Sequence, residues 1–218
     1  LPILVGGTGL YIDALIRGTA FSRRGDEALR RALAEEYDAI GGERMLERLR
    51  EADPAAAGRL HPNDKKRIVR ALEIYLATGR TITEHDEETK RVPPRYRARK
   101  IALSFQDRQD LYERINLRVD EMFRRGLVDE VRRLLDMGVT PEHTAMQAIG
   151  YKEVVQALCG NGSLEEAAEA IKLSSRRYAK RQLSWLRADE SVRWILWEKK
   201  PDFERALQIS TAYLAEIG

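Results

Sequence analysis

The first apolar run of the chain, Leu1 to Val5, ends at Gly6-Gly7-Thr8-Gly9 and passes into a helical pattern. A short apolar run of this kind, followed by an amphipathic helix, is typical of a parallel strand that is buried on both faces. The pattern therefore predicts a strand over residues 1–5 and a helix over 9–17. Two further runs, at 100–105 and 191–197, predict two more strands.

Elsewhere the apolar positions recur mostly with the helical period. They predict helices at about 26–37, 43–51, 62–78, 107–125, 128–137, 144–158, 163–186 and 202–217. The helix at 62–78 has a proline in its first turn and a glycine after its end, and the one at 163–186 begins with a Ser-Leu-Glu-Glu capping box. Residues 85–100 are charged and contain Pro93-Pro94, so they are predicted to be a linker. A few isolated strands among many helices indicate an α/β core with an inserted helical domain.

Composition narrows the possible classes of protein. The single cysteine, Cys159, excludes an internal disulfide and suits a reducing, cytoplasmic compartment. The three histidines have no metal-ligand spacing, which argues against a structural zinc site. No apolar run is long enough to span a membrane. The net charge of +3 permits an anionic partner without requiring one.

The placement of the basic residues is more informative than their number. Lys172, Arg176 and Lys180 share one helix face, Arg177 and Arg181 form the adjacent column, and no acidic residue interrupts the stretch as far as residue 187. Such a column predicts a bound polyanion, with a merely solvated face as the alternative.

A second basic cluster lies on the predicted helix after Asp107. Arg114 and Arg118 lie one turn apart there and could clamp an anion, unless Glu113 and Asp120 pair with them. Gly150 lies inside a predicted helix and suggests the close approach of another helix or a ligand. The Gly-Gly-Thr-Gly turn lacks the dinucleotide-binding spacing, and the chain contains no Gly-Lys-Ser/Thr phosphate loop. From these residues alone, the chain is a basic, helix-rich protein that handles a polyanion.

Five blocks of sequence carry a resemblance to a known family. They are PILVGGTGLYIDALIRG, HPNDKKRIVRALEIYLATGRTITE, DRQDLYERINLRVDEMFRRGLVDEV, TAMQAIGYKEVV and SRRYAKRQLSWLR, in this order. Together they resemble the tRNA dimethylallyltransferase (isopentenyltransferase) family over nearly the whole chain. The resemblance implies transfer of a dimethylallyl group from dimethylallyl diphosphate to N6 of adenine 37, beside the anticodon of tRNAs that read codons beginning with U.

The resemblance also implies a fold, a cofactor and partners. The expected fold is an α/β P-loop kinase-like core with a helical insertion, and the chain itself is expected to be mostly helical. Residues 1–18 would belong to the core, residues 19–99 to the tRNA-contacting insertion, and residues 100–218 to the core again. Mg²⁺ is the expected cofactor, the tRNA anticodon stem-loop and dimethylallyl diphosphate are the expected partners, and a monomer is expected.

The site residues that the resemblance implies fall into two groups. Thr8 would orient the target adenine, and Arg118 would contact the diphosphate. The tRNA-contacting positions would be Thr8, Arg30, Lys66, Arg67, Ile68, Val69, Arg70, Gln147, Ala148, Ile149, Gly150, Tyr151, Lys152, Lys180, Arg181, Gln182, Leu183, Ser184, Trp185, Leu186 and Arg187.

One departure from the family pattern limits these expectations. Members of the family carry a further part before the LVGGTGLY block, with the phosphate loop and the aspartate that serves as general base. The chain is therefore expected to be a C-terminal portion that is inactive alone. Two alternatives stay open. One is a helical RNA-binding module, and the other is a P-loop relative that phosphorylates a small molecule. Binding of tRNA would distinguish the family's tRNA-modifying enzyme from such a kinase.

Overall fold

The computed structural model describes residues 2–18 and 26–216. The chain divides into two compact units. The first comprises residues 1–6 and 10–98, and the second comprises residues 7–9 and 99–218. Each unit has its own hydrophobic core.

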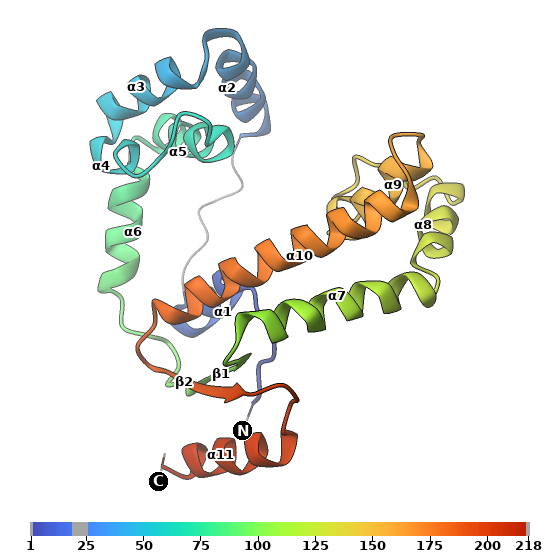
Figure 1. The fold of residues 1–218 in the computed structure, drawn as a ribbon. Helices are drawn as coiled ribbons and strands as arrows, with labels where there is room; N and C mark the ends of the chain where they lie inside the picture. The colour runs from blue at the N-terminus through green and yellow to red at the C-terminus, as the bar shows by residue number, and fades with distance from the viewer. Residues whose placement is uncertain (1, 19–25, 217–218) are drawn as a thin grey trace. The chain divides into compact units, whose positions relative to one another are not determined.

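The first unit is helical (Figure 1). Its elements are α1 (Gly9–Arg17), whose first residue lies in the second unit, α2 (Glu27–Ile40), α3 (Gly42–Ala52), α4 (Pro54–Ala57), α5 (Lys65–Thr78) and α6 (Ile82–Arg91). Helices α2, α3 and α5 pack on one another around Leu33, Met45, Leu49, Ile68 and Leu72, which are almost completely buried. Ile68 and Leu72 lie four residues apart, so the buried face of α5 follows the helical period.

A buried aspartate ties the short helix α4 to α6. Asp53 caps α4 by accepting a hydrogen bond from the Ala56 amide (2.9 Å), and it also accepts hydrogen bonds from the Thr83 amide (3.1 Å) and hydroxyl (2.7 Å). Burial raises the pKa of Asp53, but these hydrogen bonds outweigh burial and hold the pKa below its ordinary value. The two helices are therefore connected through a carboxylate whose two oxygens both accept hydrogen bonds.

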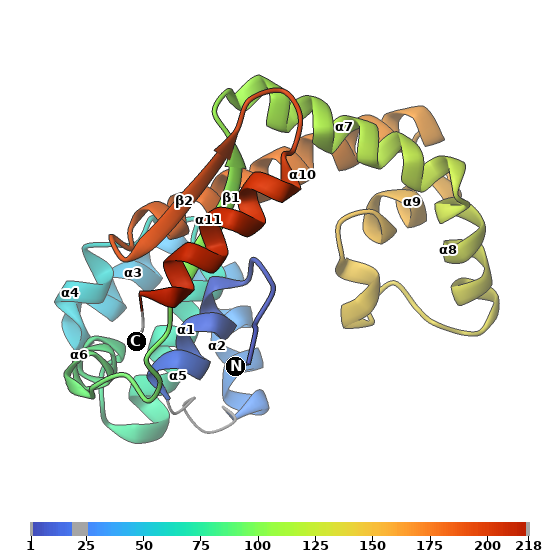
Figure 2. The same cartoon turned by 90° about the horizontal axis from the view of Figure 1, so that it is seen from below.

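The second unit combines a two-stranded sheet with helices (Figures 1 and 2). Its elements are β1 (Lys100–Phe105), α7 (Arg108–Arg124), α8 (Leu127–Asp136), the 3₁₀ turn η1 (Thr144–Gln147), α9 (Tyr151–Leu158), α10 (Leu164–Arg187), β2 (Val192–Trp197) and α11 (Phe203–Ala215). β1 and β2 are parallel, with Lys100 opposite Val192 and Phe105 opposite Trp197. The predicted strands at 100–105 and near 191–197 are confirmed.

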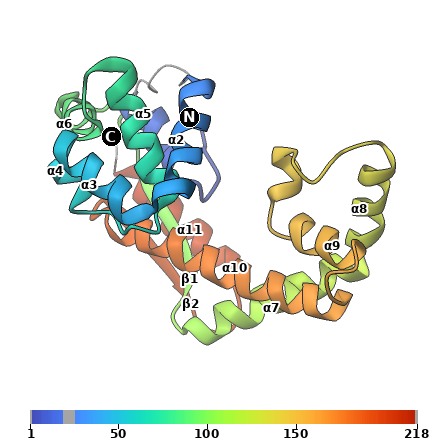
Figure 3. The ribbon, with the colours of Figure 1, turned by 90° about the horizontal axis from the view of Figure 1, so that it is seen from above.

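Helices α7 and α10 lie side by side and carry α8 and α9 at their far ends, as Figures 1 and 3 show. Val119, Val131, Met146, Val154 and Ile171 form the core between these helices. The Ser163 capping box predicted for α10 is present, with the Ser163 side chain accepting from the Glu166 amide. None of the helices in residues 2–18 and 26–216 is long and apolar enough to cross a membrane.

The strand predicted over residues 1–5 is wrong for residues 2–5, which have no strand pairing; Leu1 lies outside the described residues. Ile3, Leu4 and Val5 are 80%, 58% and 90% exposed. A parallel strand needs hydrogen-bonded neighbours, and β1 and β2 pair only with each other among the residues that the structure describes. The apolar run alone could not reveal this.

Three other predictions are corrected by local backbone chemistry. The linker predicted from residue 85 is helical as far as Arg91, because a Thr81–Glu84 capping box starts α6. The single helix predicted at 144–158 is split at Gly150, whose φ of +107° is incompatible with a continuous helix. Helix α5 begins at Lys65 rather than Pro62, because the Asp64 amide closes a turn onto the His61 carbonyl (2.8 Å).

A charged contact connects the two strands at one end of the sheet. The Lys100 Nζ atom lies 2.5 Å from Asp189 Oδ2, and the Ser191 amide and hydroxyl donate to Asp189 Oδ1 at 2.9 and 2.6 Å. The hydrogen bond from Lys100, followed by those from Ser191, lowers the pKa of Asp189 to about 2. The ionised carboxylate therefore stabilises the folded unit.

Substitution Asp189→Asn tests this contact through pH. A carboxyl with a depressed pKa stabilises the fold above its unfolded pKa and loses that effect as the pH falls towards its folded pKa. Asp189→Asn should lower the free energy of unfolding by about 2 kcal/mol at neutral pH, and the difference should shrink between about pH 4 and about pH 2. Urea unfolding across this range measures it, with the exposed neighbour Glu190→Gln as control. A difference that does not vary with pH would contradict the assignment.

Candidate functional site

The Gly-Gly-Thr-Gly segment lies against the C-terminal half of α10. The Gln182 side-chain amide donates to the Gly7 carbonyl at 3.0 Å. A Cβ atom at Gly9 would lie 2.3 Å from Cε2 of Trp185, a separation that only glycine avoids. The glycines therefore allow the backbone to approach α10 closely, so the neighbour that explains Gly9 is a helix of the same chain.

Thr8 is exposed between these two contacts and precedes α1 directly. Its flanking residues are held by Gln182 and Trp185, two members of the predicted tRNA-contacting stretch 180–187. The structure thus brings Thr8 together with that stretch, although they are far apart in the sequence.

The predicted basic column on α10 is wrong at its N-terminal end. The Lys172 ammonium is 2.8 Å from Asp120 of α7 and 2.9 Å from Glu169, and its side chain is only 15% exposed. Hydrogen bonds to these two carboxylates raise the pKa of Lys172. Arg176 donates to the Asn116 side chain of α7 at 2.7 Å. Both cations anchor α10 to α7, and one of the two acidic partners of Lys172, Asp120, comes from α7, which the local sequence cannot reveal.

The C-terminal end of the column differs. Arg177, Lys180 and Arg187 are exposed, and Arg181 lies over the Tyr178 ring at 5.5 Å from its centroid. In the described part of the chain, no carboxylate forms an ion pair with these four cations. Leu183 and Leu186, from the same predicted stretch, are half-buried. Ser184 donates back to the Lys180 carbonyl at 2.9 Å. This segment of α10 presents uncompensated positive charge beside Thr8.

Arg118 is exposed on α7, next to the buried Val119. The acidic residues nearby are engaged elsewhere, because Asp120 pairs with Lys172 and Glu121 pairs with Arg125 at 2.7 Å. Within residues 2–18 and 26–216, Arg118 itself has no ion pair with a carboxylate. Its guanidinium is therefore available for an anionic ligand.

The predicted stretch 147–152 comprises the last residue of η1, the turn that follows it and the first two residues of α9. The Gln147 side chain donates to the Pro141 carbonyl (2.7 Å), and the Gly150 amide donates to Glu153 (2.9 Å). An added Cβ at Gly150 would make only ordinary contacts, so the close approach of another helix expected there is wrong. Glycine is favoured at this position by its positive φ. Ala148, Ile149 and Lys152 are exposed, and Tyr151 donates to Glu130.

In the first unit, a fully buried carboxylate organises two of the basic residues. Glu73 accepts two hydrogen bonds from Arg30 and one from Arg70, each at 3.0 Å. Burial raises the pKa of Glu73, but the two arginines outweigh burial and lower it overall. Sequence reasoning missed Glu73, although its position one helical turn after Val69 places it on the apolar face of the helix.

The residues of the stretch 66–70 therefore differ in their exposure to solvent. Lys66 and Arg67 are exposed and Arg70 is half-buried beside Glu73, whereas the side chains of Ile68 and Val69 belong to the core. No group of three or more acidic, histidine or cysteine side chains that could hold a metal occurs in the described portion of the chain.

The parallel strand pair, the helical first unit and the exposed cations around Thr8 define a mostly helical α/β protein with an exposed basic surface. Comparison with known proteins makes the class specific: residues 1–189 match the IPP transferase family model, and the chain belongs to that family.

Relatives with curated names agree with this assignment. The tRNA dimethylallyltransferase of Geobacter sulfurreducens is 50% identical over 194 residues, which are 89% of this chain and 62% of that protein. The tRNA dimethylallyltransferase of a Thermoanaerobacter species is 45% identical over 217 residues, with 69% of its own length covered. The chain thus spans about two thirds of the length of such relatives.

Solved structures are similar as well. The tRNA isopentenylpyrophosphate transferase of Bacillus halodurans has a TM-score of 0.61 and 38% identity, and the match covers 96% of this chain and 64% of that one. A eukaryotic dimethylallyltransferase acting on tRNA has a TM-score of 0.70 and 25% identity, with 97% and 56% of the two chains covered.

The contact between Gly9 and Trp185 is tested by Gly9→Ala. The added Cβ overlaps a rigid ring, and overpacking of this kind costs about 1–3 kcal/mol. Thermal unfolding of the variant should begin at a lower temperature than that of the original chain. Gly6→Ala is the matched control, because no atom lies within 4 Å of its added Cβ. Equal melting temperatures for both variants would contradict the packing described above.

Proposed function

We propose that this chain acts in tRNA prenylation, in the transfer of a dimethylallyl group from dimethylallyl diphosphate to N6 of adenine 37 in tRNAs that read codons beginning with U. The observation that carries the proposal is that the segment Gly7–Gly9, with the exposed Thr8, packs against the part of α10 that carries exposed cations, in a member of the IPP transferase family. The relatives named above are called tRNA dimethylallyltransferases, and the likeness to them supports the same reaction here.

Thr8 is proposed to orient the adenine. A neutral exocyclic amine is a weak nucleophile, so it has to be positioned and has to lose a proton as the new C–N bond forms. The Thr8 hydroxyl can accept a hydrogen bond from one N6 hydrogen, which leaves the other hydrogen for a general base. The exposure of Thr8, the hydrogen bond from Gln182 to Gly7 and the close packing of Gly9 on Trp185 favour this role.

Arg118 is proposed to neutralise the leaving group. The C–O bond to the diphosphate breaks as the dimethylallyl group is transferred, and negative charge accumulates on the diphosphate oxygens in the transition state. A guanidinium can donate two parallel hydrogen bonds to such oxygens. The absence of an ion pair to Arg118 in the described residues supports this assignment.

The exposed cations are proposed to bind tRNA phosphates. The adenine has to leave its stack to reach a reactive pocket, at a cost of a few kcal/mol that contacts elsewhere must offset. The stretches 66–70, 147–152 and 180–187, with Arg30, are the proposed contacts, and their exposed cations Lys66, Arg67, Lys152, Lys180 and Arg181 are suited to phosphates.

We further propose that catalysis needs residues beyond these 218. The β1–β2 pair would belong to a larger P-loop-like core, with residues 19–99 as an insertion, and the relatives extend beyond the matched region. Mg²⁺ would be held by residues of that larger core beyond these 218. Exposed cations spread along a helix favour a nucleic acid over the small acceptor of a kinase.

A chimera tests the proposed reaction. In it, the 218 residues replace the matched part of the Geobacter sulfurreducens relative, and it is incubated with tRNA and labelled dimethylallyl diphosphate. The chimera should label the tRNA, whereas the 218-residue chain should bind tRNA without labelling it. Labelling by the chain alone would contradict the need for further residues, and no tRNA binding by either protein would contradict the tRNA assignment.

Thr8→Ala in this chimera should reduce turnover by the equivalent of about 1–3 kcal/mol, because the adenine loses one orienting hydrogen bond. Thr8→Ser should retain most of the activity, since it keeps the hydroxyl. The melting temperature should stay constant in both variants. A large decrease in melting temperature with unchanged turnover would instead identify Thr8 as a helix cap.

Arg118→Ala in the same chimera should raise KM for dimethylallyl diphosphate and lower kcat, because the charge on the leaving group grows in the transition state. Arg118→Lys should restore activity only partly, since an ammonium cannot form the two parallel hydrogen bonds. Steady-state kinetics with each substrate varied in turn measures both effects. Normal kinetics for the prenyl donor together with weakened tRNA binding would assign Arg118 to the tRNA.

A further inference from the structure

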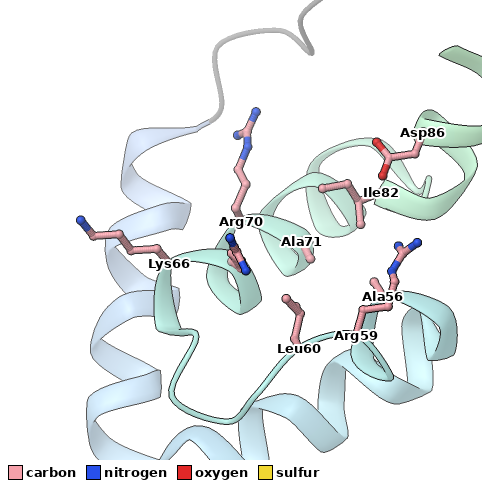
Figure 4. Close-up of a pocket in the computed structure, with 9 residues that line it drawn as sticks. Ala56, Arg59, Leu60, Lys66, Arg70, Ala71, Ile82 and Asp86 are labelled. Atoms are coloured by element: carbon pink, nitrogen blue, oxygen red, sulfur yellow. The ribbon is translucent and has the colours of Figure 1, made fainter. Parts of the chain in front are cut away.

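The first unit contains a pocket whose rim includes Lys66, Arg67 and Arg70, from the stretch 66–70 that is proposed to contact tRNA. It lies between α4, the loop that follows it, α5 and α6, and has a volume of about 370 Å³ (Figure 4). This volume falls at the lower end of the range for small-molecule sites, on the order of 300–1,000 Å³. Every residue that lines it belongs to the first unit.

The pocket has an apolar floor and a positive rim. Leu60, Ala71 and Ile82 form most of the floor, and Figure 4 shows them between Lys66 at one end and Arg59 at the other. The rim carries four cations, namely Arg59, Lys66, Arg67 and Arg70, against one carboxylate, Asp86. An apolar surface ringed by cations complements a ligand with a flat apolar part and a phosphate.

Two rim arginines are held by hydrogen bonds to residues that do not line the pocket. Arg70 donates to the buried Glu73 at 3.0 Å, and Arg59 donates to the Thr83 hydroxyl at 3.3 Å. Thr83 is in turn fixed by the buried Asp53. These side chains lose little conformational freedom when an anion binds, so the rim is preorganised.

The outer part of the rim indicates a polymeric ligand. Lys66 and Arg67 are exposed, and the guanidinium of Arg67 lies 4.0 Å from the Asp64 carboxylate, the limit for an ion pair. In Figure 4, Lys66 extends outward from the hollow. Positive charge thus continues beyond the pocket, as neighbouring phosphates of a chain require and an isolated small ligand does not.

We propose that this pocket binds one unstacked nucleotide of the tRNA, with its base on Leu60, Ala71 and Ile82 and its phosphates on the rim arginines. The inference rests on the proposed function, and it adds a recognition site on the helical unit, separate from the residues assigned to chemistry. Asp86 offers an acceptor for an N–H group of the base. Single-stranded RNA is commonly recognised through bases that leave the stack.

Methyl NMR of the 218-residue chain tests the pocket directly. Adenosine 5′-monophosphate should shift the methyl resonances of Ala71 and Ile82 and bind at least tenfold more tightly than inorganic phosphate or ribose 5-phosphate. Ile82→Ala should weaken the mononucleotide but not phosphate. Unmoved methyl resonances, or shifts with dimethylallyl diphosphate but not with the mononucleotide, would overturn the proposal.

Binding of tRNA to the same chain gives a second readout. Arg59→Gln and Arg67→Gln should each weaken tRNA binding at least fivefold and reduce the salt dependence of log K by about one unit. The control Arg44→Gln removes the same charge from the exposed surface of α3, outside the pocket, and should change binding less than twofold. Equal losses in all three variants would overturn the pocket and leave tRNA binding in place. No binding of tRNA by the unsubstituted chain would overturn the proposed function itself.

Discussion

The second unit depends on the attachment of α10 to α7. Lys172 reaches Asp120, and Arg176 reaches Asn116 while lying 5.9 Å from the Tyr112 ring centroid. These contacts, with the apolar core around Val119 and Ile171, hold α10 in place. The free end of α10 can then carry the Gly7–Gly9 segment on Gln182 and Trp185. The position of Thr8 therefore depends on helix packing at Lys172 and Arg176, ten and six residues before Gln182 on α10.

Similar residues on one helix thus serve two purposes. Lys172 and Arg176, near the middle of α10, contact Asp120 and Asn116 of α7 and contribute to folding. Lys180, Arg181 and Arg187, nearer its C-terminus, stay exposed in the segment that contacts Gly7 and Gly9, where an anion can reach them. The first unit repeats this arrangement, because Asp53 and Glu73 are buried and orient the arginines of a positive pocket.

Local signals made much of the fold predictable. The capping box at Ser163 placed the start of α10, Asp107 placed the start of α7, and the β-branched and aromatic runs placed β1 and β2. Helical periodicity predicted the wrong element where the backbone conformation of a single residue sets a helix boundary. Gly150 reads as a glycine inside a helix, yet its positive φ starts a new one. The run before Gly6 has the composition of a buried strand, but pairing depends on partners that no local pattern contains.

The candidate site was predictable mainly through the resemblance to a family. Thr8, Arg118 and the basic stretches were found in that way, whereas the partners of Lys172 and Glu73 depend on tertiary contacts. The role of Gly9 needed the position of Trp185. Charge counted along one helix could not separate anchoring cations from exposed ones, because Asp120 lies on another helix.

Lysine footprinting in the presence and absence of tRNA tests this division of α10 most directly. Acylation of the 218-residue chain, followed by mass spectrometry, measures the reactivity of each lysine. Lys180 should react readily in the free chain and be protected by tRNA, whereas Lys172, which is 15% exposed and paired with two carboxylates, should react slowly in both states. Rapid modification of Lys172, or full reactivity of Lys180 in a chain saturated with tRNA, would contradict the account.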